Sequence, residues 1–361
     1  MKIEAKTLVG PDEIKPTKPI MRVRGVFNPA AVRLPNRKIM LYARVAETPR
    51  HDEVTFLAPR FTGGKSMKIT LEKFNRRHME ICPDCSILKN EIYRLPTISH
   101  FRKILLDESG MFVESVSDKP DFYGVKDDGD FGIEDARITH LRKEKRYAMT
   151  YVSVSTDSGV STALATSRNL RDWKRHGIIF RQQNKDVAIF PEKINGYYVA
   201  LHRPEGTMIF DKPSIWVSYS RDLIFWGRDE PVMKPRKKGW DDLRVGSGHV
   251  PLKTPEGWLQ VYHGVRLSKK SNPDSHKVYS AGAVLLDLKN PSRVIARSPA
   301  NKPLFGPTLA SEKKGFNDKV VFPTAVIPDL SGKNVLVYGG AADSSISVRK
   351  ISLKSMLNSL K

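Results

Sequence analysis

The chain has 361 residues, of which 40% are hydrophobic and 9% aromatic, a composition that supports a packed core and excludes a largely disordered chain. Basic residues number 61 against 39 acidic ones, so the formal net charge is +22 and the surface attracts anions such as nucleic acid or phosphate-bearing substrates. No apolar run reaches the roughly 18 residues that span a bilayer. The segment from Met1 to Pro19 lacks the apolar core of a signal peptide, so we expect a cytoplasmic protein without a membrane partner.

One short pattern recurs five times along the chain, and each copy is a polar turn followed by a hydrophobic strand that ends in small or functional residues. The copies are Asn36 to Val45, Lys143 to Ser153, Asn195 to Pro204, Glu256 to Val265 and Gly332 to Asp343. Their separations, roughly 50 to 110 residues, leave room for a four-stranded sheet and its loops. We therefore predict an all-β fold, a five-bladed β-propeller that forms a single domain over residues 1–361.

A second repeat interleaves with the first. The segment Ser167 to Leu170 with Trp173 recurs as Ser220 to Leu223 with Trp226, and each copy indicates a turn followed by an outer strand that the Trp anchors. Amphipathic helices are scarce. The best candidate is Ile351 to Leu360, so we expect a short helical tail at about 350–361.

The segment from about 50 to 94 is a basic insertion that contains both cysteines of the chain, Cys82 and Cys85. A zinc site would need two further ligands, and no second cysteine pair exists. We expect an inert loop pair and no metal. The insertion could reshape the site for the leaving sugar or form an oligomer contact.

In a propeller the innermost strands line a central channel, so we interpret the five copies as these strands and expect their ends to meet at one mouth. The polar residues at these ends are Arg44, Ser153, His202, Arg203, His263 and Asp343. Such a convergence indicates a binding site. A ring of structural salt bridges would produce a similar pattern.

The sharpest local candidate for chemistry is the segment Gly132 to Arg137, which contains the adjacent carboxylates Glu134 and Asp135. A glycosidase needs one carboxylic acid to protonate the leaving oxygen and normally a second carboxylate. Neighbouring residues on a strand point to opposite faces, so we expect only one of the two to serve a given bond. The partner nucleophile must then come from elsewhere.

Basic residues follow in later segments, in Lys185 to Lys193, His202 to Pro204, Arg244 to His249 and Tyr262 to Gly264. Arginine gives bidentate contacts to phosphate and lysine a point charge, so this cluster indicates a phosphate site. Carboxylates or a nucleic-acid backbone are alternative ligands. The exposed aromatic residues and modules typical of RNA-binding surfaces are missing, so we expect no nucleic-acid partner.

Together these segments resemble glycoside hydrolase family 130, the mannoside phosphorylases and related mannosidases. The resemblance runs from Val26 to Asp343 and its motifs occur in family order. They are Phe27 to Pro29, Leu41 to Val45, Gly132 to Thr139, Lys185 to Lys193, Leu201 to Pro204, Ile215 and Trp216 with Ser220 to Gly227, Arg244 to Gly248, Gly257 to Val265, Gly282 to Leu288 and Ala341 to Asp343.

The resemblance implies a five-bladed propeller and an inverting phosphorolysis in which Asp135 is the general acid and inorganic phosphate is the co-substrate, with no other cofactor. It implies that the mannosyl unit is bound by Asn28, Arg44, Ser99, His100 and Asp343, and phosphate by Lys185, Lys193, Arg203, Arg244 and His263. A homo-oligomer is a candidate assembly, because propellers of this family often associate.

The segments Arg44 to Pro49 and Thr97 to Arg102, together with Ala136, resemble the branch that acts on β-1,2-mannobiose and β-1,2-oligomannosides. Two alternatives stay open. The first is a β-mannosidase of the same fold, in which Glu134 or Glu192 activates water. The second is a non-catalytic propeller that binds polyanions or proteins.

Overall fold

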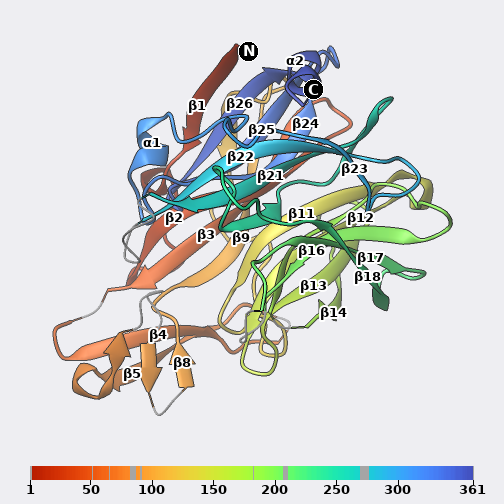
Figure 1. Cartoon of the computed structure of the whole chain (residues 1–361). Coiled ribbons are helices and arrows are strands. Elements are labelled where there is room, and N and C mark those ends of the chain that lie inside the picture. Colours follow the sequence, from red (N-terminus) through yellow and green to blue (C-terminus); the bar gives the residue numbers. More distant parts are fainter. Residues whose placement is uncertain are drawn as a thin grey trace.

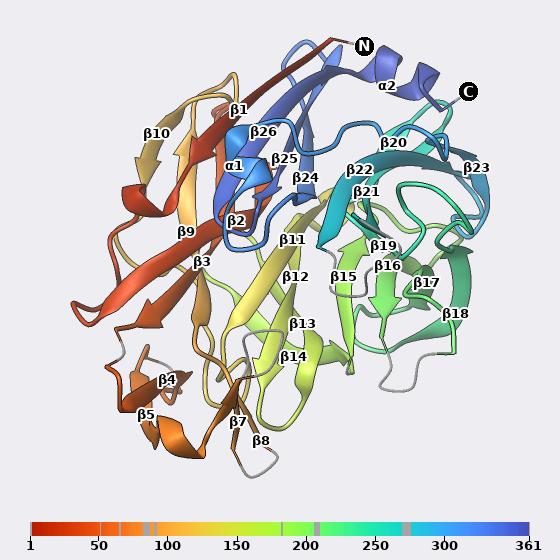
Figure 2. The ribbon, with the colours of Figure 1, turned by 60° about the vertical axis from the view of Figure 1, so that its left-hand side comes forward.

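The computed structural model describes residues 2–50, 52–64, 66–81, 87–89, 92–181, 183–205, 210–268 and 276–360. Cys82 and Cys85 lie outside these ranges. Within them, five sheets stand around a common centre, which confirms the five-bladed β-propeller (Figures 1 and 2). No helix in the described ranges has the length and apolar character needed to cross a membrane.

Each blade is an antiparallel sheet, and the first three blades follow one another along the chain. The first contains β2 (Met21–Arg33), β3 (Ile39–Pro49), β9 (Ile98–Leu106) and β10 (Val113–Val116). The second contains β11 (Ile133–Leu141), β12 (Arg146–Ser155), β13 (Gly159–Ser167) and β14 (Lys174–Phe180). The third contains β15 (Asn184–Ile189), β16 (Tyr198–Pro204), β17 (Ile215–Ser220) and β18 (Trp226–Met233).

The fourth blade contains β19 (Arg244–Ser247), β21 (Gly257–Leu267), β22 (Lys277–Leu286) and β23 (Val294–Arg297), and β20 (Leu252–Thr254) pairs with β21. The fifth contains β24 (Val321–Pro328), β25 (Asn334–Ala341), β26 (Ser345–Ser352) and, from the other end of the chain, β1 (Ile3–Val9). Because β1 pairs with β26, the N-terminal strand completes the blade that the C-terminal strands begin.

The five copies of the repeat are the second strands of the blades (β3, β12, β16, β21 and β25), so their interpretation as innermost strands was wrong. The strands that pack against neighbouring blades around the centre are β2, β11, β15, β19 and β24. The second strands run antiparallel to these, so the end of each copy lies beside the start of an innermost strand. The ends of the five copies therefore still meet at one mouth, although the copies are the second strands of their blades and not the innermost ones.

The second repeat forms the turns that the sequence indicates. The hydroxyl oxygens of Ser167 and Ser220 each accept hydrogen bonds from the backbone N–H groups two and three residues further along the chain. The last residues of these turns, Leu170 and Leu223, adopt positive φ of 61° and 73°. Trp226 then begins β18 and donates its indole N–H to the backbone oxygen of Leu223 at 2.8 Å.

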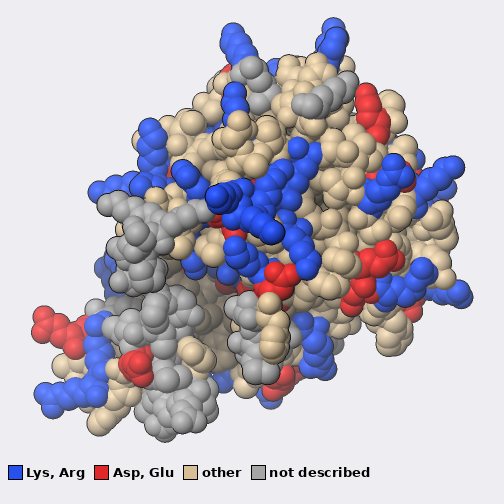
Figure 3. All heavy atoms as spheres, in the orientation of Figure 1, with Lys and Arg blue, Asp and Glu red and all other residues tan. Residues whose placement is uncertain are grey.

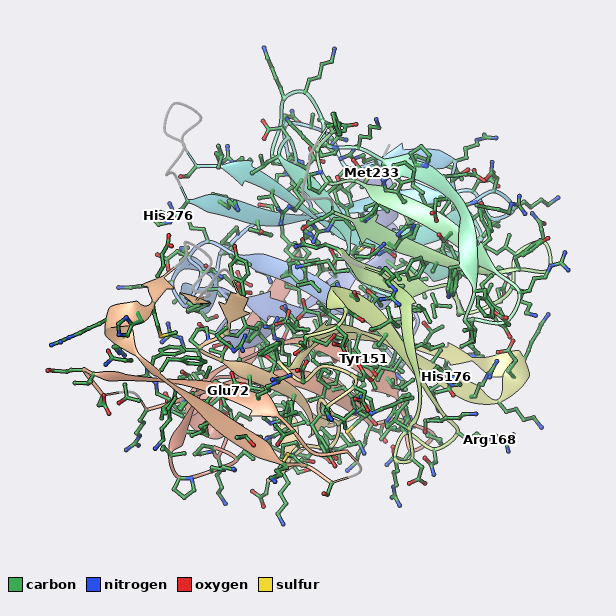
Figure 4. The ribbon with its side chains drawn as sticks, turned by 90° about the horizontal axis from the view of Figure 1, so that it is seen from below. Glu72, Tyr151, Arg168, His176, Met233 and His276 are labelled. Carbon is green, nitrogen blue, oxygen red and sulfur yellow. The ribbon has the colours of Figure 1, made fainter. Side chains whose placement is uncertain are left out.

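The basic insertion lies outside the blades, between β3 and β9, and projects from one side of the propeller (Figure 1). It contains the hairpin β4 (Thr55–Phe61) and β5 (Ile69–Asn75) and the short strands β6 (Glu80–Ile81), β7 (Ile87–Lys89) and β8 (Ile92–Arg94). Glu72 lies on the hairpin (Figure 4). Its carboxylate accepts from Arg60 and Arg94. Arg60 also pairs with the fully buried Asp130, so the insertion packs on the loop that leads into β11.

Helices are few and short, as the sequence indicates. The structure contains the 3₁₀ turns η1 (Pro11–Glu13), η2 (Arg76–His78) and η3 (Arg142–Glu144), and the helices α1 (Ala310–Lys313) and α2 (Leu353–Asn358). The C-terminal helix is shorter than the expected Ile351 to Leu360, because Ile351 and Ser352 still belong to β26. The Ser352 side chain caps α2 by accepting from the Ser355 backbone N–H.

Candidate active site

Three innermost strands contain the same backbone irregularity. The register of β2, β11 and β15 against its partner slips by one residue at Asn28, Asp135 and Asp186, respectively. Each of these residues has positive φ, of 47°, 51° and 59°. Asn and Asp tolerate this conformation better than other side chains except Gly, and a bulge re-aims the side chain it contains. Three consecutive blades therefore direct an amide or carboxylate to the mouth by the same device.

Arg44, at the end of the first copy, joins these blades. Its guanidinium donates to Asp135 Oδ1 at 3.1 Å and to Glu134 Oε1 at 2.6 Å, and Asn28 Nδ2 donates to the same Asp135 oxygen at 2.9 Å. The two carboxylates raise the pKa of Arg44 against the effect of its burial. The Arg44 Nε also donates to Ser99 Oγ at 3.1 Å, which places Ser99 beside the site.

Glu134 and Asp135 therefore face the same arginine, so the premise that these neighbours point to opposite faces was wrong, while the expectation that only one of them serves a given bond stays a prediction. Strict alternation holds for a regular strand, but here the bulge begins at Asp135 and its positive φ turns the chain. Adjacent residues consequently present their carboxylates to one centre.

Asp343 lies at the turn after β25, where it accepts from Asn317 Nδ2 at 2.6 Å. Burial raises the pKa of its carboxyl above the ordinary value; Asn317 and Arg44 oppose this rise, and the nearby Asp135 and Glu134 add to it. Asp343 therefore shares the electrostatic environment of Arg44 and Asp135. Asp343 therefore lies near Arg44, while its role in binding the mannosyl unit stays a prediction.

The basic side of the site is built around Asp186. Its carboxylate accepts from Arg203 Nε at 2.7 Å and from Arg137 Nη2 at 3.2 Å, and lies 3.7 Å from His263 Nε2. Burial alone would raise the pKa of Asp186, but its interactions with Arg203, His263 and Arg137 hold it well below its usual range. Lys185 precedes it; burial and then the charge of Arg203 lower the pKa of its ammonium group, while Glu134 and Asp135 act in the opposite direction.

His263 is fully buried, and burial lowers its pKa to about 3, so its ring is neutral near pH 7. Neither ring nitrogen has a hydrogen-bond partner within the described part of the chain, and the same is true of Asn28 Oδ1. Buried polar atoms are normally hydrogen-bonded, so these atoms are the natural contacts for a ligand. His263 can act there as a neutral donor or acceptor.

Two predicted residues do not join this centre. His100 is buried on the opposite face of its blade, because it pairs with Val45 while Ser99 pairs with Ala46. There its Nε2 accepts from Arg102, which also pairs with the buried Glu47. Lys193 is exposed, and its ammonium group lies 4.3 Å from the centre of the Tyr198 ring. Its neighbour Glu192, a candidate base of the hydrolytic alternative, pairs with the surface residue Lys253.

The family model of glycoside hydrolase family 130, described as β-1,4-mannooligosaccharide phosphorylase, matches residues 109–361. The chain belongs to glycoside hydrolase family 130.

Two curated members of family 130 illustrate the similarity. A β-1,2-mannobiose phosphorylase of Listeria innocua serovar 6a (strain ATCC BAA-680 / CLIP 11262) is 33% identical over 99% of this chain and 97% of its own length. A 1,2-β-oligomannan phosphorylase of Thermoanaerobacter sp. (strain X514) is 40% identical over 62% of this chain and 70% of its own length. The solved structure of the Listeria innocua enzyme in complex with β-1,2-mannobiose superposes with a TM-score of 0.87 at 33% identity, covering 100% of this chain and 99% of that one.

Several residues of this family-130 site were missed by sequence reasoning. Arg137 and Asp186 were named only as parts of longer motifs, although they connect the acidic and basic sides. Tyr279 lies with its ring 6.1 Å from that of His263, and Glu205 pairs with both Arg203 and Arg244. Alternation could have found Glu205, since it lies two residues after Arg203 and so on the same face of the blade.

Proposed function

We propose that this family-130 protein catalyses inverting phosphorolysis of β-mannosides, most directly β-1,2-mannobiose and short β-1,2-oligomannosides, and releases α-mannose 1-phosphate. The observation that carries the proposal is the division of the site into two adjoining halves. Asp135, held by Asn28 and Arg44, lies on one side, and the cationic groups of Lys185 and Arg203 lie on the other. The substrate class comes from the names of the two curated relatives.

In this reaction a phosphate oxygen bonds to the anomeric carbon while the glycosidic carbon–oxygen bond breaks. Asp135 gives a proton to the leaving oxygen as general acid, a contribution typically worth ~100-fold to ~10,000-fold in rate. The hydroxyl proton of HPO₄²⁻ replaces the one that Asp135 gives up. Inversion follows because phosphate attacks the face opposite the leaving sugar.

The basic half supplies positioning and charge. Arg203 and Arg244 offer N–H groups to the phosphate oxygens, and Lys185 adds a partly buried cation between phosphate and the carboxylates. Asp186 keeps Arg203 fixed by a hydrogen bond to Nε, which leaves the far end of the guanidinium for the ligand. Neutral His263 can complete the contacts without adding charge.

Hydrolysis by the same fold is the second candidate, and one observation favours it: Glu134 lies in the site. Its carboxylate, however, is engaged by Arg44 at 2.6 Å. While Arg44 holds this carboxylate, the bound oxygen is occupied and does not orient an attacking water. This contact supports phosphorolysis over hydrolysis.

The deciding experiment incubates the protein with β-1,2-mannobiose, with and without inorganic phosphate, and quantifies α-mannose 1-phosphate and free mannose. We expect mannose 1-phosphate and mannose in equal amounts, formed only with phosphate. Two mannoses released regardless of phosphate would establish the hydrolase instead. A parallel assay with β-1,4-mannobiose tests the linkage, because the family model bears a β-1,4 description.

We also propose that phosphate is the only co-substrate and that the enzyme acts in the cytoplasm on small sugars, without nucleic acid or membrane. Activity after exhaustive dialysis against a chelator tests the first statement, and cell fractionation tests the second. The homo-oligomer stays a prediction, which size-exclusion chromatography with light scattering checks.

A further inference from the structure

Glu205 is a carboxylate of the site that the reaction above does not use. It follows β16, and its backbone exchanges two hydrogen bonds with Gln183, at 2.7 and 3.1 Å, which extends the β15–β16 ladder by one pair. This pairing sets the direction of its side chain. Since Lys185 pairs with Arg203 in the same ladder, Glu205 lies on the face that carries Arg203.

The Glu205 carboxylate contacts both arginines of the phosphate site. Its Oε1 pairs with Arg203 Nη1 and lies 3.6 Å from Arg244 Nη1. The Glu205 and Arg203 side chains are only 14% and 3% exposed, so water screens this contact weakly. Asp186 already holds the Nε of Arg203, so Glu205 takes one of the groups that remain for phosphate.

We propose that Glu205 is a specificity-determining residue that competes with phosphate for Arg203 and Arg244 and thereby sets the affinity of the enzyme for its co-substrate. A phosphate dianion and a carboxylate cannot both occupy the same guanidinium N–H groups, and at this separation they repel each other. Phosphate binding must therefore displace the Glu205 side chain. The inference rests on the proposed phosphorolysis, which supplies phosphate as the ligand of these arginines.

The structure offers a place for the displaced side chain. Glu205 lines a cavity of about 290 Å³ at the edge of the third blade, together with Arg244, Lys212 and Lys234. The two lysines already bind acceptors, Lys212 the backbone oxygen of Asp242 and Lys234 the carboxylate of Asp211. A rotated Glu205 would remain in a basic environment, so its displacement does not leave a buried charge without a partner.

The test compares the KM for phosphate of the wild type with that of Glu205→Gln, which keeps the size of the side chain and removes its charge. We expect the KM for phosphate to fall by ~10-fold or more, because the repulsion is gone, while the KM for the mannoside stays unchanged. The inhibition constant of sulfate, an unreactive anion of the same shape, should fall in parallel. Thermal unfolding checks that the variant is folded, and Glu205→Asp, which withdraws the carboxylate by one methylene, should lower the KM for phosphate by a smaller factor.

Asp211→Asn is the matched control. It removes one negative charge from the same cavity, but Asp211 pairs with Lys234 and not with the two arginines. Its KM for phosphate should equal that of the wild type. An equal fall in Asp211→Asn and Glu205→Gln would overturn the proposal, since the effect would then be one of overall charge.

Three further outcomes would also overturn it. An unchanged KM for phosphate in Glu205→Gln would show that no competition exists. If Glu205→Gln bound phosphate more weakly but sulfate more tightly than the wild type, Glu205 would be shown to accept a hydrogen bond from the phosphate hydroxyl, which sulfate lacks. A loss of affinity for both anions would make Glu205 a residue that positions the arginines. Phosphate-independent turnover of the wild type, by contrast, would refute the proposed function itself, and sulfate binding would still report on Glu205.

Discussion

At the residue scale, the site depends on where an arginine meets two adjacent carboxylates. Arg44 contacts Glu134 and Asp135 together, and Asn28 supports Asp135 from the neighbouring blade. Carboxylates outnumber the single arginine on this side of the site, because Asp343 is a third carboxyl group. Burial raises the pKa of Asp343. Lys185 and the arginines of the basic half offset this excess of negative charge.

Replacing Asp135 by Asn tests the role of its proton. Asn keeps the size of the side chain and can still accept from Asn28 and Arg44, so the melting temperature should change little. We expect kcat for β-1,2-mannobiose phosphorolysis to fall at least ~100-fold, as is typical when a general acid is lost. Retention of most of the activity, measured as mannose 1-phosphate release, would remove Asp135 from this role.

Gly340 provides a test of how closely Asn28 must be held. A Cβ at Gly340 would come within 2.0 Å of Asn28 Oδ1, so Gly340→Ala must displace the Asn28 side chain from Asp135. A displacement of about 1 Å can cost ~100-fold in rate, and we expect kcat/KM to drop at least ~10-fold with the fold preserved. The matched control is Gly227→Ala, where nothing lies within 4 Å of the added carbon. Equal kinetics for the two variants would contradict this view of the site.

At the scale of elements, the blades differ in what they contribute. The first three place a polar side chain at a bulge, whereas β19 and β24 supply the neighbourhood of His263, including Phe322, whose ring lies 4.4 Å from that of His263. The insertion supports the loop before β11 through contacts among Arg60, Asp130 and Thr156, while its predicted effect on the site for the leaving sugar stays untested. The fifth blade also closes the ring.

Closure by β1 predicts a marked effect of its removal. Deleting residues 2–9 would expose the edge of β26 and uncover part of the core cluster that contains Leu8, Val9 and Val348. Unpaired edges destabilise a sheet and promote association. We expect the melting temperature to fall by several degrees and light scattering to rise on heating. An unchanged melting temperature would mean that three strands suffice for this blade.

At the scale of the whole molecule, the net charge of +22 affects the attraction of charged ligands more than it affects the fold. Lys and Arg gather toward the middle of the face in Figure 3, where acidic side chains are fewer. Both phosphate and mannose 1-phosphate are anions, so such a surface raises their local concentration. Glu205 opposes this positive electrostatic field and, by our proposal, limits the affinity of the site for phosphate.

Buried histidines predict how stability depends on pH. Burial lowers the pKa of His249 and His263 to about 3, and burial together with Arg102 holds that of His100 well below its usual range. Between their folded pKa and the unfolded value near 6.5, the unfolded chain binds more protons, so stability falls as pH falls through this window. Each such group contributes up to ~1.4 kcal/mol per pH unit.

Urea unfolding at pH 7.5, 6 and 5 measures this loss. The free energy of unfolding should be nearly constant above pH 7 and decline from pH 6 to 5, and His249→Gln should make the decline shallower. His249 is buried, and its Nε2 accepts from the Val261 backbone N–H at 2.9 Å. A decline that begins only below pH 4 would assign acid sensitivity to carboxylates instead.

The amino-acid sequence by itself determined the number of blades and the outer turns, and it named most of the residues that the structure brings together at the mouth, whose roles stay predictions. Each of these follows from a local pattern: hydrophobic strands with polar turns between them, the Ser-Arg turns, and motifs that keep their residue types in order. Only the tertiary structure decided that the repeats are second strands, that Glu134 and Asp135 face one arginine, and that His100 lies on the far side of its blade. The physical reason is that a side chain's direction depends on register, and the position of a bulge is set by the partner strand rather than by the strand that contains it.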